Sequence, residues 1–129
     1  MLLPNKKYDI IYADPPWNFK SYSKKGDGRN ATQHYNCMSI KDICNLPVKN
    51  ISKDNSMLFM WVTDPLLEKA FEVIKSWNFV YKTVAFTWAK SNKTNMGMFT
   101  GLGYWTRSNP EMCLLATKGK PKRISKSVA

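Results

Sequence analysis

The chain has few of the residues that build disulfide frameworks and metal centres. Its 129 residues include three cysteines, an odd number without C-x-x-C spacing, and one histidine, His34. This scarcity argues against a disulfide-stapled or zinc-dependent protein and fits a reducing compartment. Apolar runs are also short: none approaches the ~20 residues of a membrane span, and residues 1–7 lack the apolar core of a signal peptide. These absences predict a soluble, cytoplasmic protein with no membrane partner.

Acidic residues are scarce as well. Nine Asp and Glu stand against twenty Lys and Arg, a net charge of +11. Such an imbalance favours polyanionic partners, and nucleic acid is the leading candidate. The alternative is that the positive net charge only keeps the surface soluble. Lys24 and Lys25 belong to a polar segment after Trp17 and are candidate phosphate contacts. A second basic cluster forms the tail 119–129, which could also be only a solvated end.

The length and the 43% hydrophobic content suit one modest globular domain, 1–129. The apolar run 57–62 predicts a central parallel strand covered on both faces, and Asp64 is expected to cap a helix burying Leu66, Leu67, Ala70, Phe71, Ile74 and Trp77. The expected elements are a strand at 8–13, a helix at 40–46 behind Ser39, the strand 57–62, the helix 65–77, and an antiparallel hairpin of strands 79–90 and 111–118. A mobile loop is expected at 18–38 and a long hairpin loop at 91–110.

The tetrapeptide Asp14-Pro15-Pro16-Trp17 follows the first expected strand. In an open α/β sheet the strand ends form the ligand crevice, so Asp14 is placed to face a substrate. The two prolines stiffen the turn and leave carbonyls as acceptors. Asp14 and the Pro15 carbonyl can accept both hydrogens of an exocyclic amine, and Trp17 offers a face for a base. The alternative is an ordinary strand-ending turn with Trp17 in the core.

The chain resembles the Asp-Pro-Pro-Trp adenine-N6 methyltransferases, the family that includes the catalytic subunit of the mRNA N6-adenosine methyltransferase and many bacterial and phage DNA enzymes. The tetrapeptide carries the resemblance, and further blocks match in order over most of residues 8–128. These blocks are His34-Tyr35 with Met38-Ser39, Leu58-Phe59-Met60-Trp61-Val62-Thr63, Trp88-Ala89-Lys90, Gly101-Leu102-Gly103-Tyr104-Trp105-Thr106-Arg107, and Asn109-Pro110-Glu111 through Gly119.

The resemblance implies methyl transfer from S-adenosylmethionine to the adenine N6 amine, with DNA favoured over RNA and no metal required. Asp14, Pro15, Pro16 and Trp17 are then catalytic, and Asp14 also faces the cofactor. Asp14 would help the amine lone pair point at the methyl group and would stabilise the charge that develops on nitrogen. Trp17 would stack on or wall the flipped base. The substrate contacts implied are Tyr35, Glu111, Arg107 and Asn109.

The fold expected from this comparison is α/β: a partial Rossmann-like methyltransferase sheet with a C-terminal antiparallel hairpin and an incomplete cofactor half. Family members continue past the position of Ala129 with further cofactor contacts, so the chain looks C-terminally truncated. Strand 8–13 would then be an exposed edge that recruits a second copy or a complementing methyltransferase chain. The alternative function is a non-catalytic, nucleic-acid-binding relative, either a partner subunit or a truncated remnant.

Overall fold

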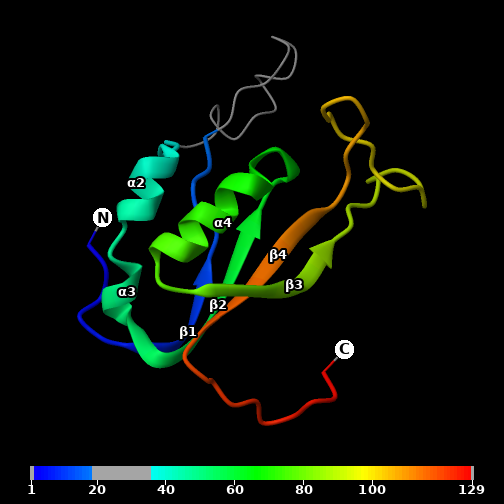
Figure 1. The fold of residues 1–129 in the computed structure, drawn as a ribbon. Coiled ribbons are helices and arrows are strands. Elements are labelled where there is room, and N and C mark those ends of the chain that lie inside the picture. The colour runs from blue at the N-terminus through cyan, green and yellow to red at the C-terminus, as the bar shows by residue number, and fades with distance from the viewer. Residues whose placement is uncertain (1, 19–35, 129) are drawn as a thin grey trace.

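A computed structural model describes residues 2–18 and 36–128, which form one layer of helices against a four-stranded sheet (Figure 1). None of the helices in these two ranges is long and apolar enough to cross a membrane. The elements in chain order are β1 (Tyr8–Ala13), α2 (Ile40–Asn45), α3 (Val48–Ile51), β2 (Ser52–Val62), the 3-10 helix η2 (Asp64–Leu66), α4 (Leu67–Ser76), β3 (Val80–Trp88) and β4 (Glu111–Lys118).

The sheet has the strand order β1-β2-β4-β3. β1 pairs with β2 in parallel, whereas β4 is antiparallel to both β2 and β3. The carboxyl ends of β1, β2 and β3 therefore meet the start of β4 at one edge of the sheet, which we call the carboxyl edge (Figure 1). The expected fold class, a partial Rossmann-like α/β sheet with a C-terminal antiparallel hairpin, is confirmed.

β2 is longer than expected and is not covered on both faces. It begins at Ser52, and along its apolar part buried and half-buried side chains alternate. Leu58, Met60 and Val62 point into a core shared with α2, α3 and α4, whereas Phe59 and Trp61 lie on the other face. Because every helix described packs against the same face, the continuous apolar run reads as a one-sided strand, and the two-sided expectation was wrong.

The helices form largely where their caps and apolar spacing predict. Ser39 caps α2, and its hydroxyl accepts a hydrogen bond from the Asp42 amide at 3.1 Å. Asp64, expected to cap the next helix, instead lies inside η2, so this expectation was wrong. Phe71, expected in the core, is 40% exposed. The side chains that are buried are spaced three or four residues apart, as expected for one face of a helix. They are Leu66, Ala70, Val73, Ile74 and Trp77.

The two ends of the sheet are β1 and β3. β1 has β2 as its only strand neighbour among the described residues, and Ile10 and Tyr12 on it are exposed. β3 and β4 form the expected antiparallel hairpin, in which Trp88 pairs with Glu111. Residues 89–110 connect them and extend from the carboxyl edge (Figure 1).

Candidate active site at the carboxyl edge

Asp14 follows β1 directly at the carboxyl edge. The residue is exposed, yet partial burial of its carboxyl group raises the pKa of Asp14, and the nearby Glu111 carboxylate raises it further. Asp14 in turn raises the pKa of the Cys113 thiol, after the larger effect of burial. These effects place Asp14, which follows β1, within electrostatic range of Glu111 and Cys113 on β4, although about a hundred residues separate them in the sequence.

The two prolines form a tight turn whose carbonyls are already used. The Pro15 oxygen accepts a hydrogen bond from the Trp17 amide at 2.8 Å, and the Pro16 oxygen accepts one from the Met38 amide at 2.9 Å. The expectation that these carbonyls are free was therefore wrong. Each carbonyl oxygen has two lone pairs, so the Pro15 oxygen retains capacity for a second donor.

Trp17 lies in the core. Its side chain is 3% exposed, and its indole N–H donates to the Trp61 carbonyl oxygen at 2.9 Å. Trp17 presents no open face to a base in this structure, so the alternative interpretation, a core tryptophan behind a strand-ending turn, is the one observed. The indole fixes the turn to the end of β2 and thereby holds Asp14 in place.

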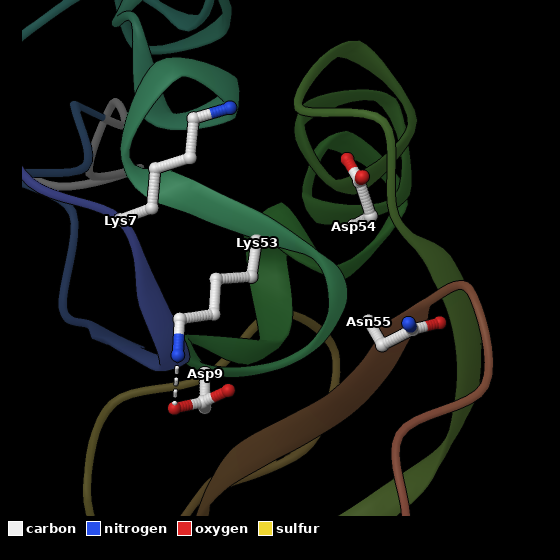
Figure 2. Close-up of a pocket in the computed structure, with 5 residues that line it drawn as sticks. All are labelled: Lys7, Asp9, Lys53, Asp54 and Asn55. Carbon is white, nitrogen blue, oxygen red and sulfur yellow. Dashed lines mark hydrogen bonds and ion pairs between the residues drawn. The ribbon is translucent and has the colours of Figure 1, made fainter.

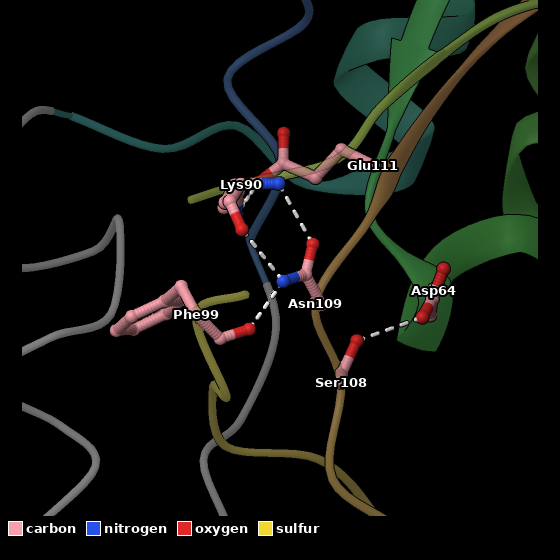
Figure 3. Close-up of polar contacts among 6 residues, drawn as sticks. All are labelled: Asp64, Lys90, Phe99, Ser108, Asn109 and Glu111. Atoms are coloured by element: carbon pink, nitrogen blue, oxygen red, sulfur yellow. Dashed lines mark hydrogen bonds and ion pairs between the residues drawn. The ribbon is translucent and has the colours of Figure 1, made fainter. Parts of the chain in front are cut away.

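Glu111 is paired with a lysine that sequence reasoning did not single out. Lys90 Nζ lies 2.7 Å from Glu111 Oε1, and the two side chains are 28% and 29% exposed (Figure 3). Lys90 could have been singled out from the sequence, because it belongs to one of the matched blocks and follows the end of the strand that pairs with β4 at Glu111. The pair gives one of the two neighbouring carboxylates a cationic partner.

Asn109 clamps the long loop beside this pair (Figure 3). Its side-chain oxygen accepts from the Lys90 amide at 2.8 Å, and its side-chain amide donates to the Lys90 carbonyl at 2.8 Å and also to the Phe99 carbonyl. Asn109 is thus near the site, but its polar groups hold backbone. Ser108 next to it donates to Asp64 Oδ2 at 2.9 Å, which ties the loop to η2.

The remaining expected substrate contacts are Arg107, Tyr35, Lys24 and Lys25. Arg107 is exposed in the loop. Tyr35, Lys24 and Lys25, and with them most of the expected mobile loop, lie outside the described residues. Within the described ranges no group of three or more His, Cys, Asp and Glu side chains could hold a metal ion.

One buried polar atom at the carboxyl edge lacks a partner among the described residues. Thr63 follows β2, and its hydroxyl oxygen makes no hydrogen bond to any described residue. A buried hydroxyl without a partner is costly, so the Thr63 hydroxyl has hydrogen-bonding capacity for a ligand or a water molecule.

The sequence profile of the MT-A70 family matches residues 8–129, almost the entire chain. The chain belongs to the MT-A70 family. It is 36% identical to the Type II methyltransferase M.MunI of Mycoplasma sp over 92% of this chain and 54% of that protein. It is also 32% identical to the Arabidopsis thaliana N6-adenosine-methyltransferase non-catalytic subunit MTB, over 91% of this chain and 15% of that protein.

More distant MT-A70 relatives match the same stretch. The human N(6)-adenosine-methyltransferase catalytic subunit METTL3 is 24% identical over 95% of this chain and 19% of its own length. The MT-A70 chain therefore spans about half of the bacterial relative and less than a fifth of the two eukaryotic subunits.

A cavity of about 340 Å³ lies away from the carboxyl edge of this MT-A70 chain (Figure 2). It is lined by Lys7, Asp9, Lys53, Asp54 and Asn55, where β1 and β2 begin. Lys53 and Asp9 form an ion pair across it at 2.9 Å. Its charges are balanced and it is remote from Asp14, so the candidate site of the MT-A70 chain is the carboxyl edge and not this cavity.

Replacing Glu111 with glutamine is expected to lower the pKa of Asp14 toward its ordinary value, because one of the two causes of the raised pKa is removed. An NMR titration of the Asp14 side-chain carbon in the wild type and the variant measures this directly, without any need for activity. Glu72→Gln, which removes an exposed carboxylate paired with Lys69 on α4, is the matched control and should leave the titration unchanged. An Asp14 midpoint that stays in place in Glu111→Gln would contradict the arrangement.

Proposed function

We propose that the chain carries the methyl-acceptor site of an N6-adenine methyltransferase that uses S-adenosylmethionine and acts on nucleic acid, DNA in preference to RNA. The observation that carries this proposal is the meeting of Asp14 with Glu111 and its Lys90 partner at the carboxyl edge. The preference for DNA is supported by the greater identity to the bacterial M.MunI than to human METTL3.

The acceptor chemistry follows from Asp14 and Pro15. An adenine amine is a weak nucleophile because its lone pair is delocalised into the ring. Two acceptors, the Asp14 carboxylate and the remaining lone pair of the Pro15 carbonyl, would bind both N6 hydrogens and favour a pyramidal nitrogen. As the N–C bond forms, positive charge grows on nitrogen, and the carboxylate stabilises that charge more in the transition state than in the ground state.

Glu111 and Lys90 would shape the other side of the acceptor site. Without the ammonium group, two carboxylates at one edge would repel each other and favour protonation of Asp14. The 2.7 Å pair with Lys90 neutralises Glu111 in part and so weakens its repulsion of the Asp14 carboxylate, and the second carboxylate oxygen of Glu111 would accept a hydrogen bond from the base. The Asn109 clamp holds Lys90 by its backbone and so fixes the pair.

The methyl donor fits the chemistry of two residues at this edge. The Thr63 hydroxyl is buried and has no hydrogen-bond partner in the part of the chain that the structure describes, and the exposed Asp14 carboxylate suits a neighbouring sulfonium. When bound, S-adenosylmethionine supplies an electrophilic methyl group. Asp14 then accepts, directly or through water, the proton that the methylated amine releases.

A second function, nucleic-acid binding without catalysis, has its own support. The chain is 32% identical to a protein named as a non-catalytic subunit, over 91% of its residues. Retention of Asp14 favours catalysis. A partner chain, either a second copy or a complementing methyltransferase segment, is part of either proposal and is supported by the outermost position of β1 with its exposed Ile10 and Tyr12. Placement in the cytoplasm remains a prediction from the sequence.

Methyl transfer should appear in adenine-containing DNA and should disappear when inosine, which lacks the exocyclic amine, replaces adenine. The test incubates the chain with S-adenosylmethionine carrying a labelled methyl group and with matched DNA and RNA oligonucleotides, and identifies the product as N6-methyladenine after digestion to nucleosides. More label in DNA than in RNA is expected. Label in the inosine substrate would contradict an N6 acceptor, and absence of label from every substrate would favour the binding function.

A further inference from the structure

The loop between β3 and β4 presents one tryptophan to solvent on a strained turn. Trp105 is 91% exposed and has a φ of +67°, in the left-handed region that residues with a side chain rarely adopt. The Thr106 amide donates to the Tyr104 carbonyl at 2.8 Å, which closes a three-residue turn around Trp105. A three-residue turn with a positive central φ is rare and strained, and such strain clusters at ligand-binding sites.

The strained turn is held by its surroundings. On either side of the turn, Gly101 and Ser108 exchange backbone hydrogen bonds of 2.6 and 3.4 Å. Position 103 requires glycine, because a Cβ atom there would lie 2.0 Å from the Thr106 carbonyl oxygen. The base of the loop is fixed by the Ser108 bond to Asp64 and by the Asn109 clamp (Figure 3). The scaffold thus maintains an arrangement that exposes a large apolar ring to water.

The position and charge of this loop identify what Trp105 would contact. Glu111 follows Trp105 by six residues, a path of at most about 22 Å when fully extended, so the indole lies within a few nucleotides of the acceptor site. Residues 89–110 contain Lys90, Lys93 and Arg107 and no aspartate or glutamate. An exposed aromatic ring among cations is the composition that binds a nucleic-acid strand by stacking and phosphate attraction.

We propose that Trp105 stacks on a nucleobase flanking the target adenine and so holds the strand in register with Asp14. The identity of the polymer rests on the proposed function. The stacking surface itself does not depend on methyl transfer. Trp105 is a substrate-positioning residue here, because its ring contacts the polymer beside the reacting base and not the amine.

Trp105→Ala is expected to weaken binding of a fluorescein-labelled, adenine-containing single-stranded DNA by about 5- to 100-fold, the usual effect of losing one aromatic–base stack. Trp105→Phe should retain most of the affinity, because phenylalanine keeps a stacking face. Met96→Ala removes another fully exposed apolar side chain of the same loop and should bind like the wild type. Fluorescence anisotropy gives the dissociation constants, and thermal melts verify that each variant folds.

The salt dependence of oligonucleotide binding distinguishes the contribution of stacking from that of phosphate attraction. The slope of log affinity against log salt should be unchanged in Trp105→Ala and shallower in Arg107→Ala, because only the latter removes a candidate phosphate contact.

Equal affinity of Trp105→Ala and wild type, an equal loss in Trp105→Phe, or no oligonucleotide binding by the wild type would overturn the proposal. Loss of self-association in Trp105→Ala, seen by sedimentation, would assign the ring to a protein partner instead. Because the binding assay requires no methyl donor, absence of methyl transfer with stacking intact would count only against the proposed reaction.

Discussion

Asp14→Asn should reduce methyl transfer by at least about 10²- to 10³-fold, the usual cost of removing one preorganised electrostatic group from an active site. Asparagine keeps the size of aspartate but carries no charge. It therefore cannot stabilise the positive nitrogen, and its amide donors can oppose the N6 hydrogens. Initial rates with labelled S-adenosylmethionine measure the loss. Asp9→Asn, a change at the start of the same strand in an exposed ion pair, is the matched control and should keep the rate.

The same substitution should make the fold more stable at neutral pH. Burial and Glu111 raise the pKa of Asp14 in the folded chain, so the unfolded chain releases this proton at lower pH. Ionisation of Asp14 therefore favours unfolding, and the wild type loses stability relative to Asp14→Asn as the pH rises through the raised pKa. Thermal melts between pH 2 and pH 8 should show melting temperatures that converge below about pH 3, where Asp14 is largely protonated in both the folded and the unfolded chain. A lower melting temperature for the variant at pH 8, or an undiminished rate, would contradict this account of Asp14.

Trp17→Ala should destabilise the fold by about 3–5 kcal/mol, the usual cost of truncating a buried tryptophan. The cavity left behind and the orphaned Trp61 carbonyl both contribute. The free energy of unfolding of a native domain is only about 5–15 kcal/mol, so this single change would remove a large share of the stability. Urea denaturation followed by circular dichroism gives the free energy of unfolding.

Trp105→Ala is the control for Trp17→Ala, because it removes the same side chain from an exposed position and should change stability by no more than about 0.5 kcal/mol. If Trp17 were a base wall and not a core residue, the two variants would unfold at similar urea concentrations. A small effect of Trp17→Ala on stability with a large effect on substrate binding would restore the stacking interpretation.

The parts of this fold that were predictable from the sequence depend on local signals. The apolar run before Asp14, the Ser39 cap and the turn-bounded strands around the long loop each lie within a few consecutive residues. Those signals located β1, α2 and the β3–β4 hairpin. The carboxyl edge followed from the topology, because strand ends gather there in any such sheet.

The errors concern contacts between segments far apart in the chain. The Trp17 indole packs in the core, where its N–H donates to the Trp61 carbonyl, 44 residues away, and Asp64 accepts from Ser108, also 44 residues away. Lys90 gains a role only when β3 lies beside β4. A sequence window contains none of these partners, so residue type alone assigned Trp17 to stacking and Asp64 to a helix cap. The partners of Trp17, Asp64 and Lys90 are therefore visible only in the folded chain.

The strand order has a consequence for how the site comes into being during synthesis. Asp14 lies near the start of the chain and Glu111 near its end, and β1 reaches β4 only through β2. A nascent chain released as far as Pro110 already contains Asp14, Lys90 and Asn109, yet it lacks the strand that holds β2 and β3 together. Contacts of such long sequence separation form late in folding. The acidic pair therefore assembles only after β4 has left the ribosome.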